Sequence, residues 1–261
     1  MRDFTLQKYK KLIESLKNQG FIFNTFNDFI INDNIESILL RHDVDKLPFN
    51  SLAIAQIENT LSIKGSYYFR ILPCSFNENI IKQIAELGHE IGYHYETMDT
   101  CKGNIDDAYD EFCKNLEKFR KIYPVKTICM HGSPRSKYDN KDIWKKYDYK
   151  KIGIIGEPYF DVDFSKVFYL TDTGRCWDGN KYSIRDKVNS SFNLSFHSTQ
   201  QIINVANQGK LPEQIMFTIH PQRWNNNMYK WVKEFVFQNM KNKIKQMLIN
   251  NESKTPNSSQ N

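Results

Sequence analysis

Residues 39–45 read Leu39-Leu40-Arg41-His42-Asp43-Val44-Asp45, and they join an apolar run to a cluster of charges. The apolar run (35–40) and the Pro48 that follows the charges are typical of a buried strand in a parallel sheet. The carboxyl ends of such strands form the edge where α/β proteins build active sites. Residues two apart on a strand share a face, so we expect Asp43 and Asp45 to point the same way. Two neighbouring carboxylates repel unless a cation or a proton lies between them, so this edge is a candidate cation site, the alternative being a solvated loop.

Helical and strand-like patterns alternate along the rest of the chain. Apolar periodicity predicts helices at residues 5–18, 51–62, 77–87, 104–122 and 201–207. Besides the strand at 35–40, strands are predicted at residues 66–71, 89–95, 125–130, 151–155, 167–170 and 215–219. Alternation without an internal linker predicts a single α/β domain over residues 1–249, with helices at both ends and about seven strands, enough to close or nearly close a barrel. Residues 250–261 are rich in Asn, Ser and Lys, and we expect a disordered tail there.

The composition is that of an ordinary soluble protein. The net charge of +6 is modest and spread along the chain, so it does not favour nucleic acid as a partner. The five cysteines form no Cys-x-x-Cys pair and are odd in number, which indicates reduced thiols. The amino terminus has no apolar core of a secretory signal, and no apolar run approaches the roughly 18 residues needed to span a bilayer. We therefore expect a cytoplasmic protein.

Polar side chains end four of the predicted strands. They are Asp43 with Asp45, His94 with Glu96, His131, and His220. Because the carboxyl ends of parallel strands lie at one edge of a sheet, these residues are expected to share a single mouth.

Three segments together resemble the polysaccharide deacetylase superfamily: Arg-His-Asp-Val-Asp (41–45), Gly-His-Glu-Ile-Gly-Tyr-His (88–94) and the late strand that ends at His220. The resemblance covers residues 36–224 as an ordered series of short motifs. It implies a distorted (β/α) barrel, usually of seven strands, that hydrolyses N- or O-acetyl groups on sugars with a divalent metal. By position it also implies roles for four residues. These are Asp43 as general base, Asp45 and His94 as metal ligands, and His220 as general acid.

One position departs from that family. A further ligand usually lies four residues after the first histidine, where this chain has Met98. A thioether is a poor ligand for an ion such as zinc, so we expect His131, which ends the next strand, to replace it, with Glu96 in reserve. The predicted centre is one divalent ion, zinc by preference, held by Asp45, His94 and His131. Three protein ligands leave a position open for water, as a catalytic site requires.

Two segments that follow strands are candidates for substrate binding. In residues 170–177, Arg175 could bind a carboxylate or phosphate in bidentate fashion, and Trp177 could stack on a sugar ring. Residues 222–224 repeat the combination of Arg and Trp. Loop salt bridges with a packing tryptophan are the alternative for both segments. The full set of candidates is Arg41, Asp172, Arg175, Trp177 and Arg223.

The remaining patterns predict structural roles, with one exception. His42 and His89 are expected to make packing and hydrogen-bond contacts, and His197 to lie near the start of a helix. The exception is the stretch 228–249, whose apolar residues and lysines predict a basic amphipathic helix. We expect this helix either to pack on the barrel or to bind the surface of a membrane that contains anionic lipid.

These patterns predict a cytoplasmic metal-dependent hydrolase that deacetylates a sugar, N-acetyl rather than O-acetyl, on a precursor of a surface polysaccharide. Two other functions stay open. One is a metal-independent amidohydrolase on the same scaffold, in which Met98 marks loss of the ion. The other is a glycan-binding protein without catalysis.

Overall fold

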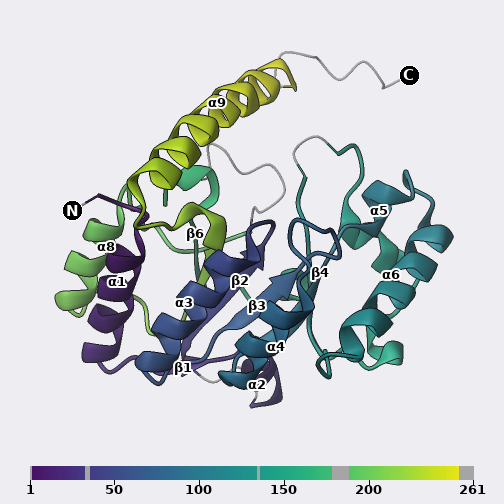
Figure 1. Cartoon of the computed structure of the whole chain (residues 1–261), viewed down its shortest axis with the longest axis horizontal. Helices are drawn as coiled ribbons and strands as arrows, with labels where there is room; N and C mark the ends of the chain where they lie inside the picture. The colour runs from purple at the N-terminus through teal and green to yellow at the C-terminus, as the bar shows by residue number, and fades with distance from the viewer. Residues whose placement is uncertain (1, 33–35, 134–135, 178–187, 253–261) are drawn as a thin grey trace.

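A curled parallel sheet forms the centre of the molecule in the computed structural model, which describes residues 2–32, 36–133, 136–177 and 188–252 (Figure 1). The strand order is β5-β4-β3-β2-β7-β6, and β1 pairs with the first residues of β2. The strands are β1 (Phe23–Asn24), β2 (Ile38–Val44), β3 (Ser66–Phe69), β4 (Glu90–Tyr95), β5 (Ile128–Met130), β6 (Phe168–Thr171) and β7 (Ile215–Ile219). Within the described residues the end strands β5 and β6 do not pair, so the sheet is a half-barrel. The predicted α/β fold of the distorted-barrel type is confirmed.

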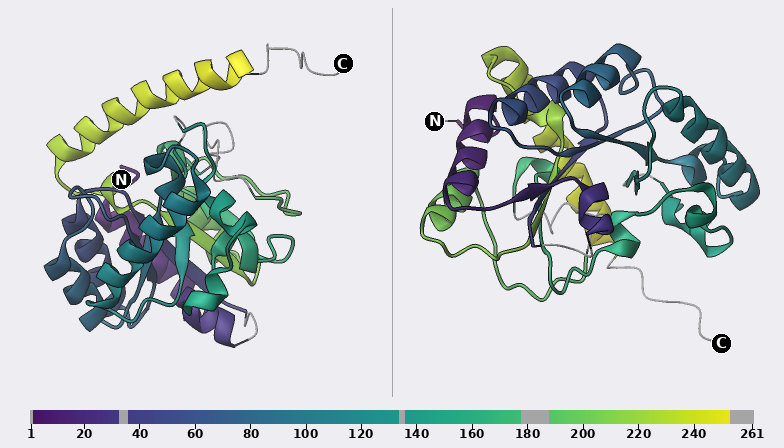
Figure 2. Two further views of the ribbon diagram at one scale, coloured as in Figure 1. Left: turned by 90° about the vertical axis from the view of Figure 1, so that its right-hand side faces the viewer. Right: turned by 90° about the horizontal axis from the view of Figure 1, so that it is seen from below.

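Helices cover the outer face of this sheet (Figure 2). They are α1 (Leu6–Asn18), α3 (Pro48–Thr60), α4 (Glu78–Glu86), α6 (Ile105–Arg120) and α8 (Thr199–Asn207), whose buried apolar residues lie in the large core. The other α-helices are α2 (Phe26–Ile31), which packs in a second cluster, α5 (Thr97–Thr100), α7 (Pro158–Asp161) and α9 (Met228–Glu252). Short 3-10 helices are η1 (Asn140–Lys145), η2 (Tyr149–Ile152), η3 (Thr173–Arg175) and η5 (Pro221–Arg223). Several helices begin at a side chain that accepts a backbone N–H of the first turn, among them Thr5, Thr25, Asn77, Asn104 and Ser198.

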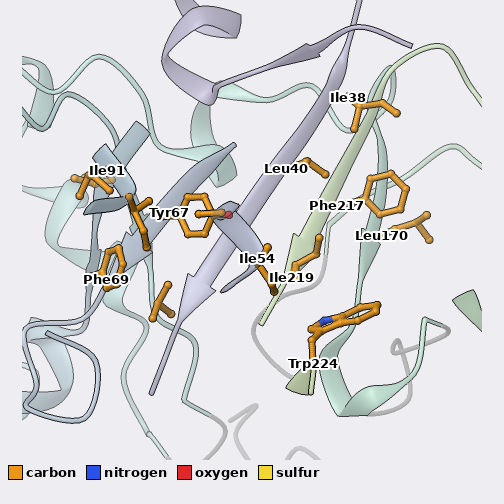
Figure 3. Close-up of a cluster of buried hydrophobic side chains, with 14 of the residues drawn as sticks. Ile38, Leu40, Ile54, Tyr67, Phe69, Ile91, Leu170, Phe217, Ile219 and Trp224 are labelled. Carbon is orange, nitrogen blue, oxygen red and sulfur yellow. The ribbon is translucent and has the colours of Figure 1, made fainter. Parts of the chain in front are cut away.

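The central strand β2 is buried at every residue, and its two faces belong to different clusters. Ile38 and Leu40 lie in the large core together with Tyr67 and Phe217 of the neighbouring strands (Figure 3). Leu39 lies in a second cluster on the opposite face. Because side chains alternate along a strand, His42 faces the first cluster, whereas Arg41 and Asp43 face the second.

A buried polar network lies on the helix-covered face of β2. Glu58 of α3 accepts a hydrogen bond from Tyr67 Oη at 2.6 Å, and its other oxygen lies 2.9 Å from His42 Nε2. His89 Nδ1 accepts the backbone N–H of Gly65 at 3.1 Å. His42 and His89 are both fully enclosed, so both have the structural roles expected from the sequence.

The predicted strands differ from the observed ones in three ways. β2 does not end at residue 40 but runs to Val44, since the charges within it find partners in the protein. Residues 151–155 form no strand: the turn η2 is capped by Asp148 and ends at Gly153, whose φ of +76° stops an extended chain. The sheet still has seven strands, because it contains β1, which the sequence pattern did not predict.

The carboxy-terminal helix α9 extends beyond the body of the molecule (Figures 1 and 2). It continues to Glu252, past the predicted limit of residue 249, and residues 253–261 of the predicted tail lie outside the described residues. Among the helices that the structure describes, α9 included, none combines the length and apolarity that crossing a bilayer needs.

Candidate metal centre

Three predicted ligands converge at the carboxyl ends of β2, β4 and β5. Asp45 follows β2, His94 lies in β4 and His131 follows β5. Asp45 Oδ1 lies 3.7 Å from His94 Nε2 and 3.5 Å from His131 Nε2. One ligand atom from each residue lies within 4.8 Å of the other two. Zinc–ligand bonds of about 2.0 to 2.1 Å in a tetrahedron separate neighbouring ligand atoms by about 3.3 Å, so a small contraction would close this group around one ion.

The ligand atoms have the free lone pairs that a cation needs. Asp45 Oδ1 is buried and has no hydrogen-bond partner among the described residues, while Oδ2 accepts from Gln222 Nε2 at 2.9 Å. His94 Nδ1 lies 2.9 Å from the carbonyl oxygen of Cys129, which can only accept, so Nδ1 carries the proton. The lone pair of His94 is therefore on Nε2, the atom that faces Asp45. A buried, unpaired oxygen beside two imidazole nitrogens fits a divalent cation.

Burial and the neighbouring charges hold His94 and Asp45 in the ionic forms that bind metal, whereas His131 would have to release a proton to bind an ion. Burial lowers the pKa of His94 to about 4, so its ring is neutral at neutral pH. Burial alone would raise the pKa of Asp45, but the nearby histidines, His131 first, lower it to about 2. Burial alone would lower the pKa of His131, but the contacts with Glu96 and Asp45 outweigh the effect of burial, and the pKa of His131 is raised.

The reserve ligand Glu96 lies on the other side of His131 from Asp45. Its Oε2 is 3.3 Å from His131 Nδ1, an ion-pair distance without hydrogen-bond alignment. Arg70 donates to both Glu96 oxygens, at 3.0 and 2.6 Å. Glu96 is thus placed as an outer partner that orients His131, not as a ligand beside Asp45. Met98, at the family's usual ligand position, is buried in the hydrophobic core.

The predicted general base, Asp43, is held by its neighbour on the same face of β2. Arg41 donates to both carboxylate oxygens, through Nε at 2.9 Å and Nη2 at 2.6 Å, and both side chains are nearly inaccessible. Burial would raise the pKa of Asp43, but Arg41 holds it well below its usual range. Asp43 Oδ2 lies 3.9 Å from His94 Nε2, next to the metal ligands.

The predicted general acid, His220, is fixed by a buried carboxylate. Asp172 Oδ1 lies 2.6 Å from His220 Nδ1, and Asp172 also accepts from Arg223 Nη1 at 2.6 Å and Trp224 Nε1 at 2.8 Å. His220 follows β7, which pairs with β2 so that Ile219 lies beside His42, and His220 is therefore at the same edge of the sheet as Asp43 and Asp45.

The five predicted substrate-binding residues are all buried, none more than 9% exposed. Arg41 binds Asp43, and Asp172 with Arg223 supports His220. Trp177 packs in the core and donates to Thr199 Oγ1. Arg175 stacks on Trp231, 4.3 Å from the ring centroid. These are the contacts that the five residues make within the protein, and substrate binding by any of them stays a prediction.

The sequence patterns missed three supporting residues: Arg70, Asn140 and Gln222. Arg70 directly follows β3, so the rule that polar residues end strands could have found it. Gln222 lies two residues after His220. Asn140, the first residue of η1, donates to the carbonyl oxygen of His131 at 2.8 Å, and no sequence pattern predicts that contact.

No protein-family model matches the chain, and neither does any curated protein. Several solved structures do. A CE4 family pseudoenzyme from Bacillus anthracis has a TM-score of 0.45 and 12% identity, over 81% of this chain and 62% of that one. A family 4 carbohydrate esterase from Bacillus anthracis has a TM-score of 0.42 and 11% identity, over 89% and 85% of the two chains. A CE4 esterase from Streptococcus mutans has a TM-score of 0.43 and 11% identity, over 88% and 90%. This chain thus spans less than two thirds of the pseudoenzyme.

Proposed function

We propose that this protein is a metal-dependent hydrolase that removes an acetyl group from an acetylated sugar, an N-acetyl group in preference to an O-acetyl group. The observation that carries the proposal is the convergence of Asp45, His94 and His131, whose ligand atoms lie within 4.8 Å of one another. The order of the short motifs along the sequence, which resembles the polysaccharide deacetylase superfamily, supports the same chemistry.

Asp45, His94 and His131 would hold the ion, and zinc suits one carboxylate with two imidazoles. Such an ion supplies Lewis acidity, which makes water a nucleophile near neutral pH and polarises a carbonyl group. The outer contact of His94 with Cys129 fixes which of its ring nitrogens is free, and Glu96 lies beside Nδ1 of His131, whose Nε2 is the atom near Asp45.

Two further residues would move protons. Arg41 keeps Asp43 ionised and fixes its position, so that this carboxylate can accept a proton from the attacking water. Asp172 binds His220 through Nδ1, which leaves Nε2 as the atom that can hand a proton to the departing amine. In this arrangement Asp172 orients His220.

Metal analysis of purified protein tests the proposal. The wild type should carry close to one ion per chain, whereas His94→Ala and His131→Ala should each lose most of it. His197→Ala is the matched control, because His197 is exposed and outside the cluster. Full metal content in His131→Ala together with loss in His94→Ala would show that the third ligand is assigned wrongly.

Acetate release from acetylated amino-sugar oligomers tests the chemistry separately. The wild type should release acetate, and Asp43→Asn should lower the rate by roughly 100-fold or more, in line with the usual contribution of a general base. A wild type that binds the ion but releases no acetate would favour a glycan-binding protein. Acetate release that survives complete removal of the ion would favour a metal-independent amidohydrolase.

A further inference from the structure

The helix α9 carries apolar side chains on two opposite sides. Its inner side packs on the body: Trp231 and Phe235 lie against Arg175, and Asn242 Nδ2 donates to the carbonyl oxygen of Gly174 at 2.8 Å. Glu234 lies 3.3 Å from Lys46, the residue after Asp45. The helix is therefore attached to the segments that follow β2 and β6, at the same edge of the sheet as the candidate metal centre.

The outer side of α9 forms an exposed apolar ridge. Most of its members recur every three or four residues and so share one broad face of the helix, which Val236 and Phe237 widen as sequence neighbours. They are Tyr229, Val232, Val236, Phe237, Met240 and Ile244, between 40% and 75% exposed. A contiguous apolar patch of this kind on a soluble domain marks an interaction site.

The charges around this outer ridge have one sign. Lys230, Lys233, Lys241 and Lys243 flank or interrupt it. The only carboxylate in residues 228–244 is Glu234, which is on the inner side and paired with Lys46. The outer ridge therefore offers apolar and cationic groups without an acidic one.

This charge pattern selects one occupant. A second copy of the chain, packed ridge to ridge, would place lysines against lysines, and their repulsion would destabilise the interface. Residues 253–261 contain no aromatic or branched aliphatic side chain, and Pro256 alone offers little apolar area to pack on the ridge. A bilayer with anionic headgroups offers both an apolar interior and negative charge, which matches the ridge on both counts.

We propose that α9 docks this protein on an anionic lipid surface, with the outer ridge between the headgroups and its lysines against the phosphates. Since the inner side of the same helix packs beside the metal centre, docking would bring that site close to the bilayer. The acetylated sugar would then be one carried on a lipid, and this second statement rests on the proposed hydrolase function.

Co-sedimentation of the full chain with vesicles tests the docking. The wild type should bind vesicles of phosphatidylcholine with phosphatidylglycerol and bind phosphatidylcholine alone much more weakly. Replacing Val236 and Met240 together by Gln should weaken binding roughly tenfold or more, because two apolar side chains leave the membrane. Ile22→Gln is the matched control: Ile22 is 59% exposed and lies outside α9, so this variant should bind as the wild type does.

The lysines are tested in the same assay. Each lysine near an anionic surface contributes about fivefold to binding, so Lys233→Gln with Lys243→Gln should weaken it by roughly 30-fold. Docking on anionic lipid is overturned if the wild type stays in the supernatant, binds neutral vesicles equally well, or is unaffected by the ridge variant. It is also overturned if the wild type is a dimer in lipid-free buffer that the ridge variant dissociates. Metal content of the same samples reports on the hydrolase proposal independently.

Discussion

At the scale of single residues, the candidate site depends on partners that the ligands themselves do not reveal. Each candidate group has a second side chain or carbonyl beside it: Asp43 has Arg41, Asp45 has Gln222, His94 has Cys129, His131 has Glu96, and His220 has Asp172. Such partners limit how far a side chain must move when a metal ion binds.

The contact between Glu96 and His131 gives a prediction at this scale. Glu96→Gln should weaken metal affinity by roughly 10- to 100-fold, because a neutral amide interacts less strongly with His131 Nδ1 and releases Arg70 from its ion pair. Competition with a chromophoric chelator would measure the change. Glu86→Gln, on the exposed end of α4, should leave the affinity unchanged. If Glu96 bound the ion directly, Glu96→Gln would instead lower the metal occupancy as severely as His94→Ala does.

The sequence patterns indicated that the candidate ligands lie at one edge of the sheet but did not indicate all of their supporting contacts, and metal binding itself stays a prediction. Asp45, His94, His131 and His220 all follow or end strands, and strand ends can be located from apolar runs. The burial of Trp177 and Arg175 could not be predicted in this way. Their surroundings include Phe4 and Trp231, which come from opposite ends of the chain.

At the scale of elements, the close packing of β3 on β4 explains the second glycine of the motif at residues 88–94. A Cβ on Gly92 would lie 2.3 Å from the ring of Tyr68, whose hydroxyl is bonded to Thr127 Oγ1 at 3.0 Å. No larger residue fits without displacing that ring. The tyrosine that excludes a side chain at Gly92 can be identified only once the two strands are paired.

Gly92→Ala should therefore destabilise the protein by about 1 to 3 kcal/mol, the usual cost of overpacking a core. The free energy of unfolding in urea would measure it. Adding Tyr68→Leu to Gly92→Ala should cost less than the sum of the two single changes, because the smaller side chain makes room for the methyl group. Additive effects would mean that the tyrosine ring is not what excludes a side chain at residue 92.

At the scale of the whole molecule, acid sensitivity should follow from the network around Glu58. Burial would raise the pKa of Glu58, but the charge and hydrogen bond of His42, with His89 and Tyr67, lower it below the ordinary 4.5. A carboxyl whose pKa is lowered by folding contributes stability above its unfolded pKa. That contribution is present at neutral pH and is lost as the pH falls below about 4.5.

Glu58→Gln should accordingly lower the free energy of unfolding at pH 7 by about 3 kcal/mol, the cost of breaking a buried ion-paired network. Its stability should also fall less steeply than that of the wild type below pH 4.5. Urea unfolding at several pH values would show both effects. Glu78→Gln, which removes an exposed pair with Lys82, should change stability by less than about 0.5 kcal/mol. If the free energy of unfolding fell equally steeply below pH 4.5 in the wild type and in Glu58→Gln, the acid-sensitive carboxyl would be a residue other than Glu58.

The two faces of the central strand β2 differ in their access to water. Asp45 is partly exposed at the mouth, whereas the hydroxyl protons of Tyr9 and Tyr67 on Glu58 are sealed between α3 and the sheet. Those sealed protons can exchange with deuterium only when α3 lifts from the strands. Their lifetimes would report how often the barrel wall opens.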